Sequence, residues 1–163
     1  MSAHLNPYFE RQYAYSRWAN QQVIDLLKTT TLTEDREILV ELSHEIAAFE
    51  IWISRIQGRA PRVGGVWEIY DLARCEALNN EVLADWLAYI PTMKHEDYFR
   101  IIAYKNTKGD YYETPVIDIM GHAPTHGNYH RARIAVLIRA KGFIPVNTDF
   151  ITYARNFALN FQA

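Results

Sequence analysis

The segment Gly121-His-Ala-Pro-Thr-His-Gly-Asn-Tyr-His-Arg131 holds three of the six histidines of this 163-residue chain. His122, His126 and His130 are spaced four residues apart, and an apolar run from Ile134 to Ile138 follows them. Residues four apart on an α-helix lie on one face, close enough for two imidazoles to bind the same metal ion. The segment therefore predicts the first part of a helix that carries a candidate metal site.

Pro124 separates the first histidine from the other two. A proline inside a helix removes the hydrogen bond to the carbonyl four residues back and kinks the helix or forces a bulge. We therefore expect the helix to be interrupted there and His122 to leave the register, while His126 and His130 share a stripe with Ile134 that faces the core. The spacing alone is only moderately specific, because histidines satisfied by ordinary core contacts can show it too.

The rest of the chain has the periodicity of further long helices. Apolar residues recur at three- and four-residue intervals over about 6–28, 34–57 and 68–89, and the histidine-bearing helix should run from about 115 to 141. A capping box formed by Thr31 and Glu34 predicts the start of the second helix, and Gly58 predicts its end. This helix is apolar on two faces, which is typical of a helix packed between neighbours in a bundle.

A different period appears between the third and fourth helices. Phe99, Ile101 and Ala103 alternate with their neighbours, and residues 111–114 can form a partner strand beyond a loop at 106–109. A last short helix is expected from about residue 149 to 161. The predicted fold class is all-α, a four-helix bundle with a short β-hairpin before the last long helix and a small C-terminal helix, in one domain over residues 1–163.

Composition argues against several classes of protein. The net charge is −2 and no Lys/Arg cluster forms a stripe, so we expect no nucleic-acid partner. No apolar run approaches the roughly 18 residues that span a membrane, and the first residues lack the pattern of a signal peptide. The single cysteine, Cys75, excludes an intrachain disulfide and fits a reducing compartment. We therefore expect a cytoplasmic protein with no membrane partner.

Polar residues also fall on inward faces of the first two helices. His44 lies among small and aliphatic residues. Such a lone histidine is more often a satisfied core residue than a ligand, but beside His126 and His130 it becomes the natural third ligand. Ser16 and Asn20 either form local hydrogen bonds inside the bundle or line a polar pocket. Three protein ligands leave coordination positions open, which is typical of a catalytic rather than a structural metal site.

No catalytic base can be assigned from the sequence. The segment is not a zinc-peptidase motif, because Gly127 stands where His-Glu-x-x-His requires glutamate. Glu41 and Glu45 lie near His44 in sequence but could equally be solvated. The sequence also lacks nucleophile-elbow, P-loop and dinucleotide-binding glycine patterns. The catalytic residues therefore remain unknown at this stage.

Several motifs resemble the DinB/YfiT-like family of metal-binding four-helix bundles. The matching residues are Tyr15-x-x-Trp18-x-Asn20, His44 with Trp52, Asn106-Thr-Lys-Gly109, His122-x-x-x-His126-Gly-x-x-His130-Arg131, and Gly142-x-x-Pro145 with Asp149 and Tyr153. The resemblance implies that His44, His126 and His130 hold a divalent transition metal: zinc, nickel or iron. It covers most of the chain. The pair Ala132-Arg133 departs from the Gly-Gln that usually follows His-Arg in the family, which leaves the surroundings of the ligands open.

Three further residues are candidates for the pocket or for contacts around the ligands: His122, Asn20 and Arg131. For His122 an ordinary structural role is favoured over a role in the site. Arg131 is interpreted as a brace for packing or for a loop, because it points about 100° away from His130 around the helix. The resemblance further implies a small-molecule substrate, in some members a low-molecular-weight thiol, and a homodimer. We expect a metal-dependent enzyme, either a thiol transferase or a hydrolase; the alternative is a non-catalytic metal-binding or interaction protein with the same bundle.

Overall fold

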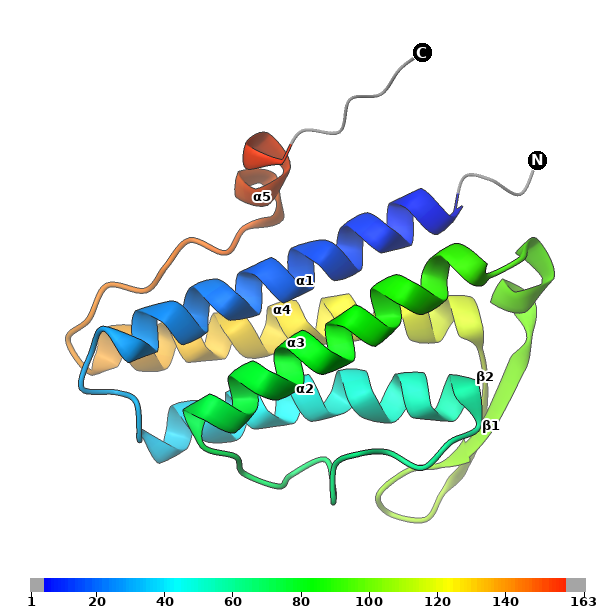
Figure 1. Cartoon of the computed structure of the whole chain (residues 1–163). Coiled ribbons are helices and arrows are strands. Elements are labelled where there is room, and N and C mark those ends of the chain that lie inside the picture. The colour runs from blue at the N-terminus through cyan, green and yellow to red at the C-terminus, as the bar shows by residue number, and fades with distance from the viewer. Residues whose placement is uncertain (1–4, 158–163) are drawn as a thin grey trace.

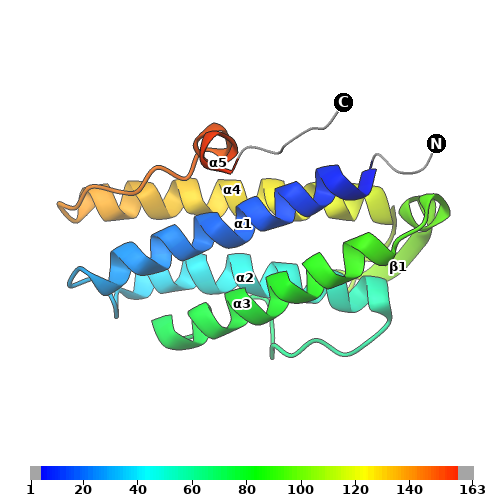
Figure 2. The ribbon, with the colours of Figure 1, turned by 45° about the horizontal axis from the view of Figure 1, so that its top comes forward.

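The computed structural model describes residues 5–157, and four long helices make up its bundle. They are α1 (Leu5–Lys28), α2 (Arg36–Gln57), α3 (Leu72–Tyr89) and α4 (Val116–Ala140). Helix α2 packs against α4 and α3, and α1 packs against α3 and α4 (Figures 1 and 2). The segment between α2 and α3 runs back along the bundle, so these two helices point the same way (Figure 1). The predicted all-α four-helix bundle is confirmed.

Two helix starts lie later than the sequence predicts. Helix α2 is capped by Asp35, whose side chain accepts a hydrogen bond from the backbone N–H of Ile38, so the capping box expected at Thr31 and Glu34 is wrong. Helix α3 is capped in the same way by Asp71 rather than starting near residue 68. Aspartate is among the best N-cap residues because its carboxylate accepts from the free N–H groups of the first turn. At the other end of α2, Gly58 adopts φ 67° and ends the helix as predicted.

The predicted hairpin is present and short. Strands β1 (Ile101–Lys105) and β2 (Tyr111–Pro115) pair antiparallel, with Ala103 opposite Glu113. The residues just before β1 form a 3-10 helix, η2 (His95–Phe99), and another, η1 (Ile90–Thr92), follows α3. The hairpin lies at the end of the bundle where α2 ends and α4 begins (Figure 1). Its position brings the strands beside the last turns of α2.

The small C-terminal helix is also present as α5 (Phe150–Asn156), which packs on α1 through Tyr15 and Tyr153. The predicted continuation of this helix to residue 161 lies outside the described residues. No helix within residues 5–157 combines the length and apolarity that crossing a bilayer requires.

Helix α4 runs through Pro124 without interruption, contrary to the sequence expectation. Pro124 has no N–H to donate to the carbonyl of Met120, and that carbonyl instead accepts a hydrogen bond from the Tyr13 hydroxyl at 3.2 Å. Tyr13 is fully buried on α1. A neighbouring helix therefore satisfies the backbone group that proline frees, and the three histidines of α4 stay on one continuous helix.

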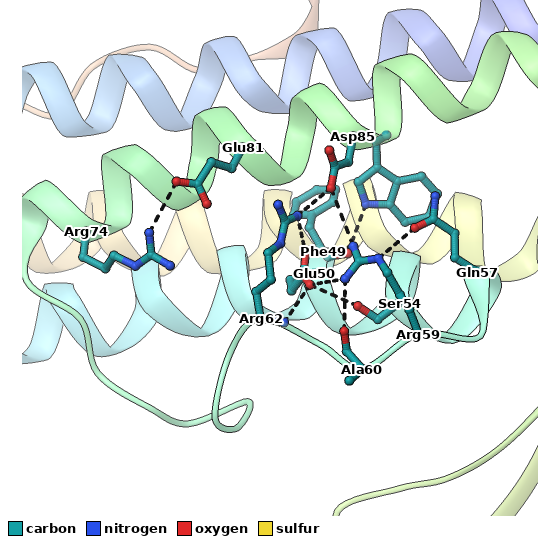
Figure 3. Close-up of polar contacts among 11 residues, drawn as sticks. Phe49, Glu50, Ser54, Gln57, Arg59, Ala60, Arg62, Arg74, Glu81 and Asp85 are labelled. Carbon is teal, nitrogen blue, oxygen red and sulfur yellow. Dashed lines mark hydrogen bonds and ion pairs between the residues drawn. The ribbon is translucent and has the colours of Figure 1, made fainter.

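A buried carboxylate fixes the beginning of the segment that connects α2 to α3. The Glu50 side chain is fully buried and pairs with Arg59 at 2.7 Å and with Arg62 at 2.7 Å (Figure 3). The backbone N–H of Arg62 and the hydroxyl of Ser54 also donate to Glu50. These contacts hold the first residues of the connection against α2. The middle part of the connection then runs back along the same helix.

Candidate metal centre

The three histidines expected to act as ligands lie together between α2 and α4. One ring nitrogen from each of His44, His126 and His130 lies within 4.8 Å of the others. The Nε2 atoms of His44 and His126 are 3.1 Å apart. Two nitrogens that bind one tetrahedral zinc ion at about 2.0–2.1 Å lie roughly 3.3 Å from each other. The spacing and the donor type both fit a divalent transition metal.

The ring of His44 is held by the α2–α3 connection. Its Nδ1 lies 2.9 Å from the carbonyl oxygen of Val66, and because a carbonyl can only accept, Nδ1 carries the proton. In the neutral ring this leaves the lone pair on Nε2, the atom that faces His126. The indole of Trp67 stacks on the same ring, with centroids 3.8 Å apart. Two consecutive residues of one loop thus set the tautomer and the plane of His44.

A carboxylate orients His130 in a similar way. The Nδ1 of His130 lies 2.6 Å from Glu41 Oε2, and the other oxygen of Glu41 forms an ion pair with Arg133 at 2.8 Å. Glu41 and His130 are both buried. Histidines that bind metals commonly donate their second ring N–H to a carboxylate or a backbone carbonyl, which fixes the ring and raises its basicity. His44 and His130 show one of each arrangement.

The environment favours neutral imidazoles, which are the form that binds metal ions. Burial lowers the pKa of His126, and together with the neighbouring His130, His44 and His122 it brings this pKa to about 4. Burial also lowers the pKa of His44, although the contact with Val66 opposes this shift. At neutral pH, His44 and His126 are therefore unprotonated and can donate lone pairs.

A cavity of about 430 Å³ adjoins the histidines on one side. His44, His126 and His122 line it, together with Val66 and Trp67 of the α2–α3 connection. The remaining lining residues come from the last part of α2 and from the hairpin: Ala48, Ile51, Trp52, Arg55, Tyr104, Asn106, Thr107 and Tyr112. A small molecule that enters this cavity would reach the nitrogens of His44 and His126.

The sequence model described as the DinB family matches residues 1–156, which is nearly the whole chain. The chain belongs to the DinB family. The Protein DinB of Bacillus subtilis (strain 168) is 26% identical over 172 residues, a match that covers 86% of this chain and 90% of that protein. The crystal structure of a DinB-like protein from Bacillus cereus ATCC 10987 matches with a TM-score of 0.66 and 16% identity, over 85% of this chain and 94% of that one. This second likeness shows the shared fold.

In this DinB-family chain, His122 lies beside the three-histidine group and is not part of it. Its ring centroid is 5.2 Å from that of His126, and its edge contacts Trp52. Burial lowers the pKa of His122 too. The continuous helix keeps it on the same side as His126, where it lines the cavity.

Asn20 and Arg131 belong to a buried polar cluster next to the histidines. The guanidinium of Arg131 pairs with Glu45 and donates to Asn20 Oδ1 at 2.7 Å. It also donates to Asn128. A Cβ at Gly127 would lie 2.8 Å from Glu45 Oε1 and 3.0 Å from Arg131 Nη1. Glycine at this position, where a zinc peptidase would have glutamate, leaves room for the ion pair.

Sequence reasoning missed two kinds of contact around the ligands. Glu41 and Glu45 are buried rather than solvated, and Glu41 contacts His130. The spacing of Glu41 and His44 on one helix face was a signal that could have identified the carboxylate. For Val66 and Trp67 the local sequence offers no such signal. The Ser16 hydroxyl donates to the carbonyl of Gln12, so it is satisfied by local bonding and does not line the site.

Proposed function

We propose that this protein binds one divalent transition-metal ion through His44, His126 and His130. The observation that supports this most directly is the convergence of three imidazoles, two of which have their Nδ1 atoms held by Val66 and Glu41. Zinc, nickel and iron all accept three imidazole ligands, so metal availability would decide among them. Membership of the DinB family is compatible with this function.

We further propose that the protein is an enzyme acting on a small molecule, with a low-molecular-weight thiol as one substrate. A bound divalent ion would supply a Lewis acid that lowers the pKa of a thiol or of water beside it. The residues of the chain would then bind and orient the reactants in the cavity, and the stacked Trp67 would keep the ring of His44 in place. With water in place of the thiol, the same site would suit a hydrolase.

The carboxylates nearest to the site favour an orienting role over a proton-transfer role. Glu41 is shared between His130 and Arg133, and Glu45 is paired with Arg131. Neither lines the cavity beside His44 and His126. A non-catalytic metal-binding protein would need the same ligands and the same orienting contacts, so catalysis must be tested separately from metal binding.

Metal analysis of protein purified without an affinity tag tests the first proposal. We expect close to one equivalent of zinc, nickel or iron after reconstitution, and loss of that metal in His126→Ala and in His130→Ala. His122→Ala is the matched control, because it removes the third histidine of the same helix. It should keep the metal, since His122 is not one of the three ligands. Binding of less than about a tenth of an equivalent by the unaltered protein, or loss of metal in His122→Ala alone, would contradict the ligand assignment.

Turnover by metal-loaded protein tests the second proposal. Each of several low-molecular-weight thiols would be incubated with 1-chloro-2,4-dinitrobenzene, where a thiolate sulfur forms a bond to the ring carbon and chloride leaves. Ester and amide panels would test the hydrolase. Metal-dependent product formation that is lost in His126→Ala supports an enzyme. No turnover on any panel by fully loaded protein would favour the non-catalytic protein.

A further inference from the structure

The cavity beside the histidines has an uneven distribution of charge. Arg55 is the one lysine or arginine among its lining residues, and no aspartate or glutamate within residues 5–157 lines it. The whole chain carries a net charge of −2, so the positive character is local to this cavity. A metal ion held by His44 and its two partner histidines would add to this positive character. Such a lining attracts an anion and disfavours a cation.

Arg55 lies against two aromatic rings that meet nearly at a right angle. The central carbon of its guanidinium lies 4.6 Å from the ring centroid of Trp52 and 4.4 Å from that of Tyr104. Its Nη2 donates to the carbonyl of Lys105 at 3.1 Å. The cation–π contacts with these rings and one backbone hydrogen bond restrict the Arg55 side chain. The other N–H donors of the guanidinium remain available to another acceptor.

Arg55 differs from the neighbouring arginines because it has no carboxylate partner among the described residues. Arg59 and Arg62 lie just beyond it and both pair with Glu50. Among the described residues no acidic side chain forms an ion pair with Arg55. Burial lowers the pKa of Arg55, which is the effect of partial removal from water without a compensating carboxylate. A guanidinium in this condition gains most from an anion that supplies two oxygens.

The other walls are suited to a flat apolar group. Trp52, Trp67, Tyr104 and Tyr112 all line the cavity, and they come from α2, the α2–α3 connection and both strands of the hairpin. Aromatic side chains offer large apolar surfaces on which planar groups stack. The cavity of about 430 Å³ is large enough for an aromatic ring with a short substituent.

We propose that this cavity binds a carboxylate joined to an aromatic ring by a short chain, with the carboxylate paired to Arg55 and the ring against the aromatic walls. The opposite end of the ligand then points towards His44 and His126. The inference rests on the proposed metal-dependent enzyme, whose reaction would take place at the end of the ligand near the histidines. It names the chemical class of the second substrate of that enzyme. Pairing with Arg55 and contact with the aromatic walls do not themselves require the metal.

An alternative role for Arg55 is purely structural, since it connects α2 to the hairpin. Arg100 provides a matched control: its Nη2 donates to the carbonyl of Ile56 at 3.0 Å, which also ties the start of the hairpin to α2. Arg100 does not line the cavity. Substitution of both arginines by glutamine therefore separates a ligand contact from a brace.

The test is an NMR titration of the full chain with 3-phenylpropionate and with its neutral amide, 3-phenylpropionamide. The indole N–H signals of Trp52 and Trp67 report on binding in the cavity. We expect the carboxylate to bind about tenfold more tightly than the amide, because it alone gains a charged hydrogen-bonded pair. Arg55→Gln should remove this difference, Arg55→Lys should keep part of it, and Arg100→Gln should leave it unchanged.

The titration is done on zinc-loaded and on metal-free protein, so that the two proposals can fail separately. Equal affinity for acid and amide, or a preference that survives in folded Arg55→Gln, would overturn the Arg55 inference and leave metal binding untouched. A preference seen only with zinc and insensitive to Arg55→Gln would assign the carboxylate to the metal and overturn the inference too. Absence of zinc binding would overturn the proposed function, while the metal-free titration would still decide on Arg55. If Arg55→Gln does not fold, Arg55→Lys and the acid–amide comparison in unaltered protein still decide.

Discussion

Helix α2 carries two buried polar clusters that differ in how their polar atoms are satisfied. At Glu50, opposite charges meet: both carboxylate oxygens accept from arginines, and the backbone of Arg62 and the hydroxyl of Ser54 complete the cluster (Figure 3). About two turns earlier on the helix, His44 meets His126 and His130, which are groups of the same kind. Each cluster contacts the α2–α3 connection, one through Arg59 and Arg62 and the other through Val66.

The difference separates a structural cluster from a candidate binding site. The Glu50 cluster is neutralised within the chain, and the arginine contacts hold the pKa of Glu50 at about 2, against the opposing effect of burial. Three converging imidazoles satisfy one another only in part. The Nδ1 atoms of His44 and His130 already face Val66 and Glu41, so only His126 has an N–H that can be donated to a neighbouring ring, and a lone pair is left without a donor. Two of the three rings are oriented from behind by Val66 and Glu41. Such an arrangement favours a cation from outside the chain.

The largest expected effect on stability comes from removing the structural carboxylate. Glu50→Ala should lower the free energy of unfolding by about 3 kcal/mol, since it leaves Arg59 and Arg62 without their buried partner. Urea denaturation of metal-free protein measures this change. The control Glu81→Ala breaks an exposed pair with Arg74 and should cost less than about 0.5 kcal/mol. Equal losses in the two variants would contradict the structural role given to Glu50.

The same cluster should make stability fall in acid. Because the pKa of Glu50 lies at about 2 in the folded chain and near 4.5 when unfolded, its contribution is present above pH 4.5 and is lost as the pH falls towards 2. Between pH 5 and pH 3 the unaltered protein should lose about 2 kcal/mol more stability than Glu50→Gln. Parallel pH profiles of the two proteins, measured by urea denaturation, would show that Glu50 does not titrate in this window.

At the histidine cluster, a change in an orienting carboxylate should affect metal affinity more than folding. Glu41→Gln should weaken zinc binding by about ten- to a hundredfold, because it replaces the charged acceptor that holds His130. Competition with a chromophoric chelator measures the affinity. Glu37→Gln is the control on the same helix, since Glu37 pairs with Lys141 and not with a histidine. If Glu41→Gln binds zinc as tightly as the unaltered protein, the contact between Glu41 and His130 does not contribute to metal binding.

The smallest expected effect compares two glycines of α4. Gly127→Ala should destabilise the protein by about 1–2 kcal/mol, because its Cβ would press on the Glu45–Arg131 pair. Gly121→Ala meets nothing within 4 Å and should stabilise the helix by up to about 1 kcal/mol. Thermal unfolding of both variants measures the contrast. A stabilised Gly127→Ala would mean that the ion pair can shift to make room.

The sequence by itself determined the parts that depend on local periodicity. Helical spacing identified the four long helices, alternation identified the hairpin, and the interval between His126 and His130 placed both on one face of α4. These features depend on residues three or four apart, whose relative positions follow from helix geometry alone. The inward face of the second helix offered His44 as the third ligand and the DinB resemblance implied the same residue, which the structure brings beside the other two.

Only the tertiary structure decided the contacts between distant segments. Tyr13 of α1 satisfies the Met120 carbonyl that Pro124 frees, so a proline that local rules read as an interruption lies inside a continuous helix. Packing of α2 on α4 brings Glu41 to His130 across 89 positions of the chain. The returning connection brings Trp67 over His44. No local spacing encodes these pairs, because each depends on which faces of the bundle meet and on the path of the connection between helices.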